Sequence, residues 1–367
     1  MKEYKNYSLL QHNTFGIDAK CRRFLEYESV EEAQQIAAFL NDNDQPLLIL
    51  GGGSNLLLTG DYPATVVHSA IKGIEIIRNS EYLNCNDGRL NDNLTLGTKK
   101  STLVKCGSGV VFDDFIAWAV EHQLYGVENL SLIPGEVGAS AVQNIGAYGA
   151  EAKDVIFEIE AVELATGKVK IFRNEECEYA YRQSKFKQEW KDKFLITHVT
   201  YLLNNTFSPK LDYGNIRSSL EEKFQLAGES FDVAKLTAKV LRDVIIEIRK
   251  EKLPEPTEFG NAGSFFMNPI IEEKTFLGLK NKFPNLRYFE VSDGNVLRYK
   301  IPAGWMIDQC GWKGKNLGKA GVWPKQALVL YNVGGAKGEE VVALCNAIRK
   351  DVKEKFGLDI YPEVNIK

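Results

Sequence analysis

The sequence predicts an α+β fold, in which strands and helices occur in separate runs. Two amphipathic helices are expected at about 233–250 and 339–356, while two strands are expected side by side in the chain at 156–164 and 169–172. This order lacks the regular βαβ alternation of a doubly wound parallel sheet. With 367 residues the chain is also long for one hydrophobic core, so we expect two or three domains.

The first elements are a helix and two short strands. Ser29 and Glu32 have the spacing of a capping box, and apolar residues then recur at helical period to about Leu40. The apolar runs 47–50 and 65–68 predict short buried strands.

The middle of the chain begins with a polar segment at 78–100, rich in Asn, Gly and Asp, which predicts a long exposed hairpin or loop. Residues 112–120 place their apolar side chains on one helical face. Thr166-Gly167 is a plausible turn between the two following strands.

The C-terminal helices carry clear stop signals. Pro254 and Pro256 end the helix at 233–250 and mark a domain boundary, and Gly357 has the position of a C-terminal cap for the last helix.

Composition excludes several classes of function. The formal net charge of −4 provides no general attraction for nucleic acid, and no apolar run approaches 18 residues. The six cysteines are scattered without a C-x-x-C pair, and the four histidines lie far apart in the sequence. We therefore expect no metal centre and no disulfide framework.

Gly51-Gly-Gly-Ser-Asn55 follows an apolar strand directly. Glycines there permit a close approach of the main chain to a phosphate, and successive N–H groups can form an anion-binding nest. The loop is neither a Walker A motif nor a dinucleotide fingerprint, because no Gly-Lys-Ser/Thr follows and Leu56 replaces the third glycine. A tight turn between strands is the alternative interpretation.

A second cluster of small residues extends from Ile133 to Gly149 and is too rich in glycine to favour a helix or a strand. Together the two loops favour a large cofactor, although structural turns remain an alternative.

The combined motifs resemble the UDP-N-acetylenolpyruvoylglucosamine reductase family. The matching segments are collinear from about residue 12 to 364: His12-Asn-Thr-Phe-Gly16, Gly51-Gly-Gly-Ser-Asn55, Glu128-Asn-Leu, Ile133-Pro-Gly135, Gln143-Asn-Ile-Gly-Ala-Tyr-Gly149, Tyr181-Arg182, Gly260-Asn-Ala-Gly-Ser-Phe-Phe266, Ala303-Gly-Trp-Met-Ile-Asp308 and Pro362-Glu-Val364. The Leu-Asp-Tyr-Gly214 motif that contains Tyr213, together with the segment 181–190, resembles the subclass with an extra loop that closes over the nucleotide sugar. The segment 78–100 is longer than the family pattern.

The resemblance implies an FAD-binding fold of the vanillyl-alcohol-oxidase type with two subdomains, followed by a smaller α+β substrate-binding domain. Residues 1–70 and 71–253 would be the two FAD-binding subdomains, and 254–367 the substrate-binding domain. It implies an enzyme that uses NADPH to reduce UDP-N-acetylglucosamine enolpyruvate to UDP-N-acetylmuramate in peptidoglycan precursor synthesis. We expect a cytoplasmic monomer with a small-molecule substrate and no nucleic acid or membrane partner.

The resemblance places non-covalently bound FAD on the two small-residue loops. The expected cofactor-binding residues are Gly51, Gly52, Gly53, Ser54, Asn55, Ile133, Pro134, Gly135, Gln143, Asn144, Gly146, Ala147 and Tyr148. A covalent link is not expected, because Ser54 and Asn55 occupy the region where relatives of the fold carry a linking histidine.

The reaction implied by the resemblance needs a proton donor and a means of stabilising negative charge on the substrate. Ser264 would protonate the α-carbon, because a carbanionic carbon needs no strong acid. Arg182 and Glu363 would polarise the substrate carboxylate. From residue type alone, the alternatives are a turn serine, a surface ion pair and a solvated carboxylate.

The expected substrate-binding residues are Tyr213, Lys252, Asn268 and Gln326. Lysine supplies a point charge for phosphate, and tyrosine offers a flat face with a hydroxyl. Lys252 could equally be the solvated end of its helix.

Two other functions remain open: a flavin oxidase that uses O₂, and a nucleotide-binding scaffold without chemistry.

Overall fold

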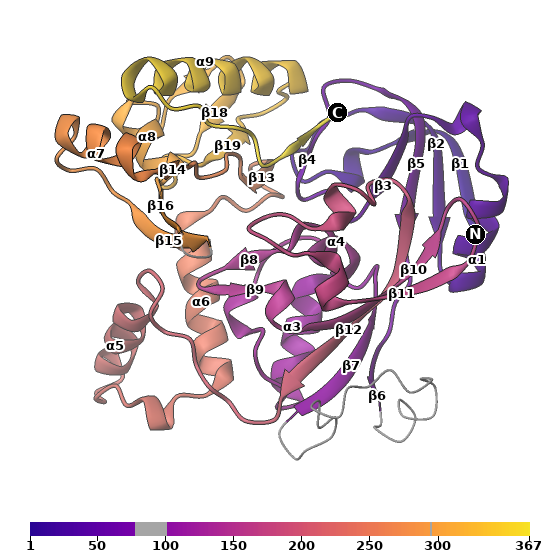
Figure 1. The fold of residues 1–367 in the computed structure, drawn as a ribbon, viewed down its shortest axis with the longest axis horizontal. Helices are drawn as coiled ribbons and strands as arrows, with labels where there is room; N and C mark the ends of the chain where they lie inside the picture. The colour runs from indigo at the N-terminus through magenta and orange to yellow at the C-terminus, as the bar shows by residue number, and fades with distance from the viewer. Residues whose placement is uncertain (78–100, 294–295) are drawn as a thin grey trace. The chain divides into compact units, whose positions relative to one another are not determined.

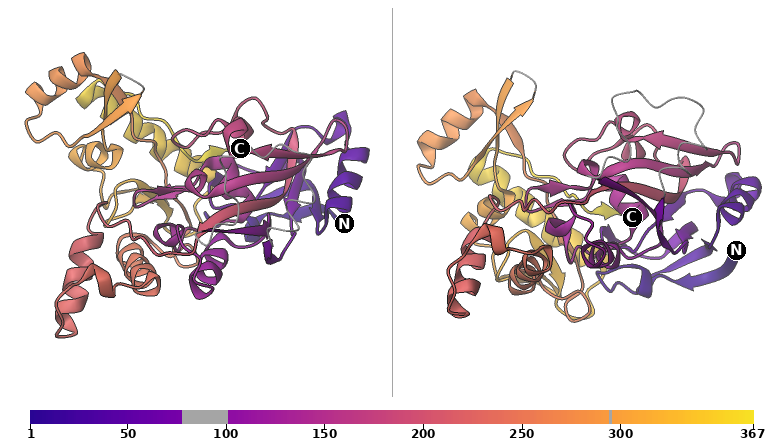
Figure 2. Two further views of the ribbon diagram at one scale, coloured as in Figure 1. Left: turned by 60° about the horizontal axis from the view of Figure 1, so that its bottom comes forward. Right: turned by 90° about the horizontal axis from the view of Figure 1, so that it is seen from below.

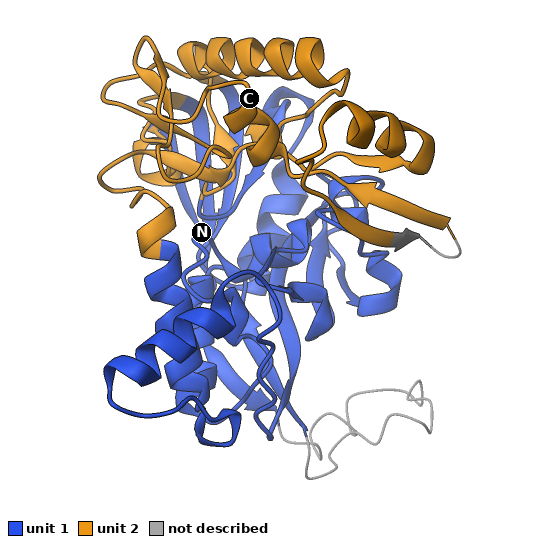
Figure 3. Ribbon diagram, turned by 90° about the vertical axis from the view of Figure 1, so that its left-hand side faces the viewer, with its two compact units in different colours: residues 1–7, 21–52, 63–249 blue, residues 8–20, 53–62, 250–367 orange. Residues whose placement is uncertain are grey.

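The computed structural model describes residues 1–77, 101–293 and 296–367 (Figure 1). They form two compact units, each built from separate stretches of the chain (Figure 3). Unit 1 comprises 1–7, 21–52 and 63–249, and unit 2 comprises 8–20, 53–62 and 250–367. The predicted polar hairpin at 78–100 lies outside the described residues. The division into 1–70, 71–253 and 254–367 stays a prediction.

Unit 1 contains a five-stranded antiparallel sheet with the order β11-β10-β12-β7-β6. Its strands are β11 (Val169–Arg173), β10 (Ile156–Glu163), β12 (Phe194–Asn204), β7 (Ser101–Gly107) and β6 (Ile74–Ile77). The predicted turn at Thr166-Gly167 is confirmed, because Gly167 has a φ of 66° and its N–H donates to the carbonyl of Glu163 at 2.8 Å.

A four-stranded sheet of order β1-β2-β5-β3 provides the second layer of unit 1. Its strands are β1 (Lys2–Ser8), β2 (Lys20–Tyr27), β5 (Tyr62–Ser69) and β3 (Leu47–Leu50). The two strands predicted at 47–50 and 65–68 are confirmed, and they pair in parallel with Leu50 opposite His68. This register brings the loop that begins at Gly51 beside the end of β5.

Helix α1 (Val30–Phe39) buries Ala33 and Ile36 against residues of both sheets, including Val67 and Leu195. The capping prediction is confirmed in part. Ser29 accepts a hydrogen bond from the Glu32 N–H at 3.2 Å, but the Glu32 carboxylate turns to the N–H of Glu28 at 2.7 Å.

Helices α3 (Phe112–Glu121) and α4 (Val137–Gln143) belong to a separate core of unit 1. Phe115 of α3 stacks on Tyr201 of β12, with ring centroids 4.4 Å apart. The expectation that 133–149 forms no helix is wrong for α4. Its Gly, Ser and Val residues have weak helix propensity, but Val137 and Ala141 are fully buried, so tertiary packing outweighs propensity.

Helix α6 (Ala238–Lys252) begins later than the predicted 233, because 233–235 form a separate 3-10 turn. The hydroxyl of Thr237 accepts a hydrogen bond from the N–H of Val240 at 3.2 Å. The apolar face of α6 shares a core with α5 (Ile216–Leu226), a helix that we did not predict. Arg242 ties α6 to α3 through two hydrogen bonds to Asp113, at 2.8 and 3.0 Å.

The main sheet of unit 2 has the order β13-β19-β18-β17. Its strands are β13 (Asn261–Ser264), β19 (Val329–Asn332), β18 (Ala320–Val322) and β17 (Asn316–Leu317). The long helix α9 (Gly338–Phe356) packs against β18 and β19 and lies alongside α8 (Ala303–Gln309) (Figures 1 and 2). The predicted last helix and its cap are confirmed, with Gly357 at a φ of 71°.

Unit 2 has two smaller sheets. One has the order β14-β16-β15 and carries α7 (Glu273–Lys282); its strands are β14 (Ile270–Glu272), β16 (Val296–Lys300) and β15 (Phe289–Asp293). In the other, β20 (Asn365–Ile366) pairs in parallel with β4 (Leu56–Leu57), directly after the first glycine loop.

Candidate active site

The first glycine loop lies directly against the segment that starts α4. A Cβ atom at Gly51 would come within 2.8 Å of the Ala139 Cβ, and one at Gly52 within 3.2 Å of the Gly135 Cα. Glycine is therefore required at Gly51 for the two loops to meet, and a side chain at Gly52 would force the backbone at Gly135 to shift. Among the described residues, the N–H groups of Gly51, Gly52 and Gly53 donate no hydrogen bond to the protein. The successive donors at Gly51 and Gly52, both in unit 1, are thus available to an anion.

Gly53 has a different requirement. Its φ is +64°, and a Cβ there would lie 1.9 Å from the carbonyl oxygen of His12. The carbonyl of Gly53 also accepts a hydrogen bond from the N–H of Thr14 at 3.2 Å. The glycine therefore allows this loop to pack on the His12-Asn-Thr-Phe-Gly16 segment. Asn55 continues the link inside unit 2, since its Nδ2 donates to the Glu363 carbonyl at 3.3 Å.

Asn144 organises the second loop through its side chain. It ends α4 in the left-handed region with a φ of 48°, and it is fully buried. Its Nδ2 donates to Glu151 and to the carbonyl of Ala180, at 2.9 and 3.0 Å, and its Oδ1 accepts from the N–H of Lys153. Because its side-chain amide is already hydrogen-bonded to the protein, Asn144 fixes the shape of the loop. A contact of Asn144 with a ligand would therefore be made by its main chain.

Arg182 is held against the same loop. Its Nη2 donates to the carbonyl of Gly146 at 2.7 Å, and its Nη1 lies 3.4 Å from the carbonyl of Asn144. Gly146 belongs to the short strand β8 (Gly146–Ala147), which pairs with β9 (Ala150–Glu151). A Cβ at Gly146 would lie 3.1 Å from Nη1 of Arg182. The predicted catalytic arginine is thus positioned by predicted cofactor-binding residues.

Tyr213 lies over the end of this loop and is 50% exposed. Its ring meets the Tyr148 ring edge to face, with centroids 6.3 Å apart, and its Cβ lies 3.4 Å from where a Cβ of Gly149 would be. Asn129 joins the two segments, because its Nδ2 donates to the carbonyls of Tyr148 and Lys210 at 2.8 and 2.9 Å. The backbone segment that leads to the exposed Tyr213 is therefore held against the second loop.

Unit 2 brings Ser264 and Glu363 onto neighbouring segments. The N–H of Glu363 donates to the carbonyl of Phe265 at 2.8 Å, and Phe266 forms an isolated bridge with Pro362. Ser264 is exposed at the end of β13 and Glu363 is half-buried. Positions 99 residues apart in the sequence are thus neighbours in the fold, as the resemblance requires.

Asn268 and Gln326 both lie at the start of α8. Asn268 Oδ1 accepts a hydrogen bond from the N–H of Ala303 at 2.8 Å. A Cβ at Gly304 would lie 3.2 Å from Oε1 of Gln326, so the glycine of the Ala303-Gly304 pair leaves room for that amide.

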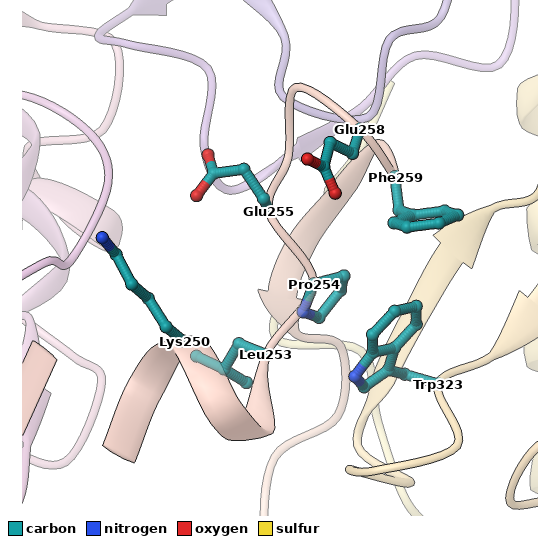
Figure 4. Close-up of a pocket in the computed structure, with 7 residues that line it drawn as sticks. All are labelled: Lys250, Leu253, Pro254, Glu255, Glu258, Phe259 and Trp323. Atoms are coloured by element: carbon teal, nitrogen blue, oxygen red, sulfur yellow. The ribbon is translucent and has the colours of Figure 1, made fainter. Parts of the chain in front are cut away.

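Lys252 is the last residue of α6 and is half-buried. Its neighbours in the chain line a hollow of about 340 Å³ in unit 2 (Figure 4). The hollow is lined by Lys250, Leu253, Pro254, Glu255, Glu258, Phe259 and Trp323. Two carboxylates beside one ammonium group make it a poor match for a diphosphate. We therefore do not place the nucleotide phosphates there.

Sequence reasoning missed the supporting residues. Asn129 lies in the quoted Glu128-Asn-Leu motif but received no role. Burial lowers the pKa of Arg249 and raises that of Tyr148, and the electrostatic interaction between the two side chains partly offsets both shifts. The sequence signal for Arg249 was its spacing from Arg242, which places both residues on the same face of a helix.

The predicted site residues fall into two groups. Arg182, Tyr213, Gly51, Gly52 and residues 133–148 lie in unit 1, while Gly53–Asn55, Lys252, Ser264, Asn268, Gln326 and Glu363 lie in unit 2. Within each unit the structure brings most of them together in the contacts described above.

Comparison with known families identifies the class of protein. Residues 22–173 match the family model described as "FAD binding domain", and residues 255–367 match "UDP-N-acetylenolpyruvoylglucosamine reductase, C-terminal domain". The chain is therefore a flavoprotein, and the predicted α+β FAD-binding fold is confirmed. The two successive N–H donors at Gly51 and Gly52 fit the pyrophosphate of such a cofactor.

Full-length relatives identify the family. The chain is 48% identical over 361 residues to the UDP-N-acetylenolpyruvoylglucosamine reductase of Bacteroides fragilis strain YCH46, covering 98% of this chain and 99% of that protein. It is 41% identical over 368 residues to that of Flavobacterium johnsoniae, with full coverage of both. The chain belongs to the UDP-N-acetylenolpyruvoylglucosamine reductase family, and the predicted resemblance is confirmed.

A solved structure supports the same fold. The UDP-N-acetylenolpyruvylglucosamine reductase of Thermus caldophilus superposes with a TM-score of 0.62 at 20% identity, over 100% of this chain and 98% of that one. Among the helices of the described residues, none has the length and apolarity needed to cross a membrane.

Proposed function

We propose that this protein uses NADPH and FAD to reduce UDP-N-acetylglucosamine enolpyruvate to UDP-N-acetylmuramate, a step in peptidoglycan precursor synthesis. The full-length identity to reductases of this name carries the proposal. The pairing of the segments that bear Ser264 and Glu363 supports it, since the reaction needs a proton donor beside a group that binds the substrate carboxylate.

The flavin would be held by main-chain N–H groups of Gly51 and Gly52 and by the 133–148 loops of unit 1. Gly53, Ser54 and Asn55 of unit 2 are further proposed cofactor-binding residues. When bound, FAD supplies the hydride chemistry that amino-acid side chains lack. The protein supplies the remaining work of binding, orientation and proton transfer.

Ser264 would donate its hydroxyl proton to the α-carbon of the substrate as negative charge develops there. Its exposure at the end of β13 leaves the hydroxyl accessible to a ligand. Glu363 would hydrogen-bond the substrate carboxylate, and Arg182 would stabilise its increasing negative charge. Donors held in advance in this way need no reorganisation during the reaction, as the fixed Arg182 illustrates.

The nucleotide-sugar would contact Tyr213, Lys252, Asn268 and Gln326. Lys252 supplies positive charge for a phosphate, and the two amides at the start of α8 supply donors and acceptors. We further propose that the protein is a cytoplasmic monomer without a nucleic-acid partner. The formal charge of −4 supports only the last point, because it gives no general attraction for nucleic acid.

Rapid mixing under anaerobic conditions tests this function. The purified chain should be yellow and should lose its visible absorbance on addition of NADPH. Absorbance should return when the enolpyruvyl sugar is added, and faster than in air alone. Reoxidation by air at the faster rate would identify an oxidase, and a colourless protein that cannot take up FAD would identify a scaffold without flavin chemistry.

A further inference from the structure

A buried histidine in unit 1 lies between two carboxylates. His68, at the end of β5, is 7% exposed. Its Nδ1 lies 3.1 Å from Oε2 of Glu26, and its Nε2 lies 3.1 Å from Oε1 of Glu136. The three side chains come from β2, β5 and the segment before α4, so the contact is set by tertiary structure.

The contacts define the protonation state of the ring. An ionised carboxylate only accepts hydrogen bonds, so both ring nitrogens must donate, and only the imidazolium has two donors. Burial alone would lower the pKa of His68, but the hydrogen bonds and charges of Glu136 and Glu26 outweigh it and raise the pKa. The group therefore carries one positive and two negative charges.

Glu136 extends from this group to the first glycine loop. A Cβ at Gly51 would lie 3.6 Å from Oε2 of Glu136, and a Cβ at Gly52 would lie 3.6 Å from its Cγ. The strand register places Leu50, the residue before this loop, opposite His68. A carboxylate thus lies directly beside N–H groups that are suited to an anion.

We propose that His68 is a positioning residue for FAD, which holds the Glu136 carboxylate and neutralises its charge beside the Gly51-Gly52 loop. Without the imidazolium, Glu136 would carry an uncompensated negative charge next to the flavin pyrophosphate and repel it. This inference rests on the proposed function, because it requires FAD to bind at that loop.

The charged and titratable groups around the ring set the expected pH dependence. Glu26 and Glu136 contact His68; Lys2 of β1 binds Glu26 at 3.1 Å, and the charge of Glu26 also acts on Tyr7 of β1. As the pH rises through the raised pKa of His68, the charge of the His68, Glu26 and Glu136 side chains changes from −1 to −2. Affinity for FAD should therefore be higher below this pKa and fall above it.

A double-mutant cycle on the full chain tests the proposal. The Kd for FAD is measured by flavin fluorescence after ultrafiltration, for the wild type, His68→Gln, Glu136→Gln and the double variant. His68→Gln should weaken binding about tenfold at low salt, within the usual range for coupling between sites. Glu136→Gln should stay within about twofold of the wild type, and adding it to His68→Gln should restore most of the loss.

The cycle separates charge from structure. If His68→Gln weakens FAD binding by the same factor in the wild type and in the Glu136→Gln variant, the effect is structural and the proposal is overturned. If His68→Gln does not fold, the pH profiles of the wild type and Glu136→Gln decide: identical profiles overturn the proposal, and a flatter profile in the variant supports it. A wild type that cannot bind FAD would instead refute the proposed function.

Discussion

The two regions that carry the candidate active site are built in different ways. In unit 1, the loops proposed to bind the cofactor depend on glycine and on buried side chains, as at Gly51 against Ala139 and at Asn144 inside its loop. In unit 2, Gly53 packs on the His12 segment in a similar way, but Ser264 is exposed at the end of a strand, and its neighbour Glu363 is held through its main chain. Changes in the glycine loops should therefore alter stability or cofactor binding, whereas changes at Ser264 should alter chemistry.

The largest effect is expected at Gly53, the loop glycine that packs on the His12 segment within unit 2. Gly53→Ala should reduce the free energy of unfolding by more than about 4 kcal/mol, because its Cβ would overlap the His12 carbonyl oxygen 1.9 Å away. Gly16→Ala is the matched control in the same unit: its φ is +65° and nothing lies within 4 Å of the added atom. It should cost about 1 kcal/mol.

Chemical denaturation of the two glycine variants makes this comparison. Equal losses in both would show that left-handed backbone strain, and not contact with His12, fixes the glycine. That result would also weaken the argument that close packing of the glycine loops makes them sensitive in stability, whereas Ser264 is sensitive in chemistry.

Ser264→Ala should slow reoxidation of the reduced flavin by the substrate at least ~10²-fold, or about 3 kcal/mol of barrier, with little change in stability. Flavin reduction by NADPH should remain nearly unchanged, because that half-reaction needs no acid at this position. Stopped-flow absorbance measures both halves, and Ser264→Cys should recover part of the rate. Equal slowing of both halves would indicate a distorted site, and an unchanged rate would assign the proton to another donor.

Substitution of Glu160 tests how much a buried charge contributes to the stability of unit 1. Burial raises its pKa, but hydrogen bonds from His198 and Thr197 and the charge of Lys105 outweigh this and lower the pKa to about 2. The folded value lies below the unfolded one, so the stabilisation is present above about pH 5 and is lost as the pH falls towards 2. Glu160→Gln should cost roughly 2 kcal/mol at pH 7 and about a quarter of that at about pH 2.5, where the folded carboxyl is already partly protonated.

Thermal unfolding at several pH values measures the Glu160 contribution, and both half-reactions should keep their rates in the folded variant. A stability loss that is independent of pH would mean that shape, and not charge, matters at this position.

The smallest effect is expected at Tyr213, which lies over the second loop but is half exposed. Tyr213→Ala should raise KM for the UDP-sugar about tenfold, because contacts to the nucleotide-sugar are lost. Flavin reduction should not change. Tyr213→Phe keeps the ring against Tyr148 and separates packing from the hydroxyl. An unchanged KM in Tyr213→Ala would place this residue outside the substrate site.

The sequence predicted elements whose signal is local. The last helix combines a long apolar period with a terminal glycine, and the structure matches it from Gly338 to Phe356. Helix α4 was missed because its stability comes from burial of Val137 and Ala141, which local propensity does not contain. The start of α6 was placed too early because Leu236 is buried without being helical.

Prediction of the site residues had the same limit, because contacts between distant residues leave no local signal in the sequence. Motifs identified Ser264 and Glu363, but only the fold shows that their segments are hydrogen-bonded neighbours. The contacts of His68 with Glu26 and Glu136 involve residues 42 and 68 positions apart, and no periodicity or motif connects them. Such pairs become visible only when distant strands and helices are placed in space.

The pairing of β20 with β4 has a consequence for biosynthesis. Thr59 and Lys367, which close this pair, are 308 residues apart. At roughly 5 to 20 residues per second, the ribosome takes on the order of 15 to 60 s to make that stretch. During this time the edge of β4 lacks its partner, so unit 2 cannot be completed before residues 365–367 have been made. Folding of this unit is therefore expected to finish only once residues 365–367 have left the ribosome, with the strand edge open to chaperones until then.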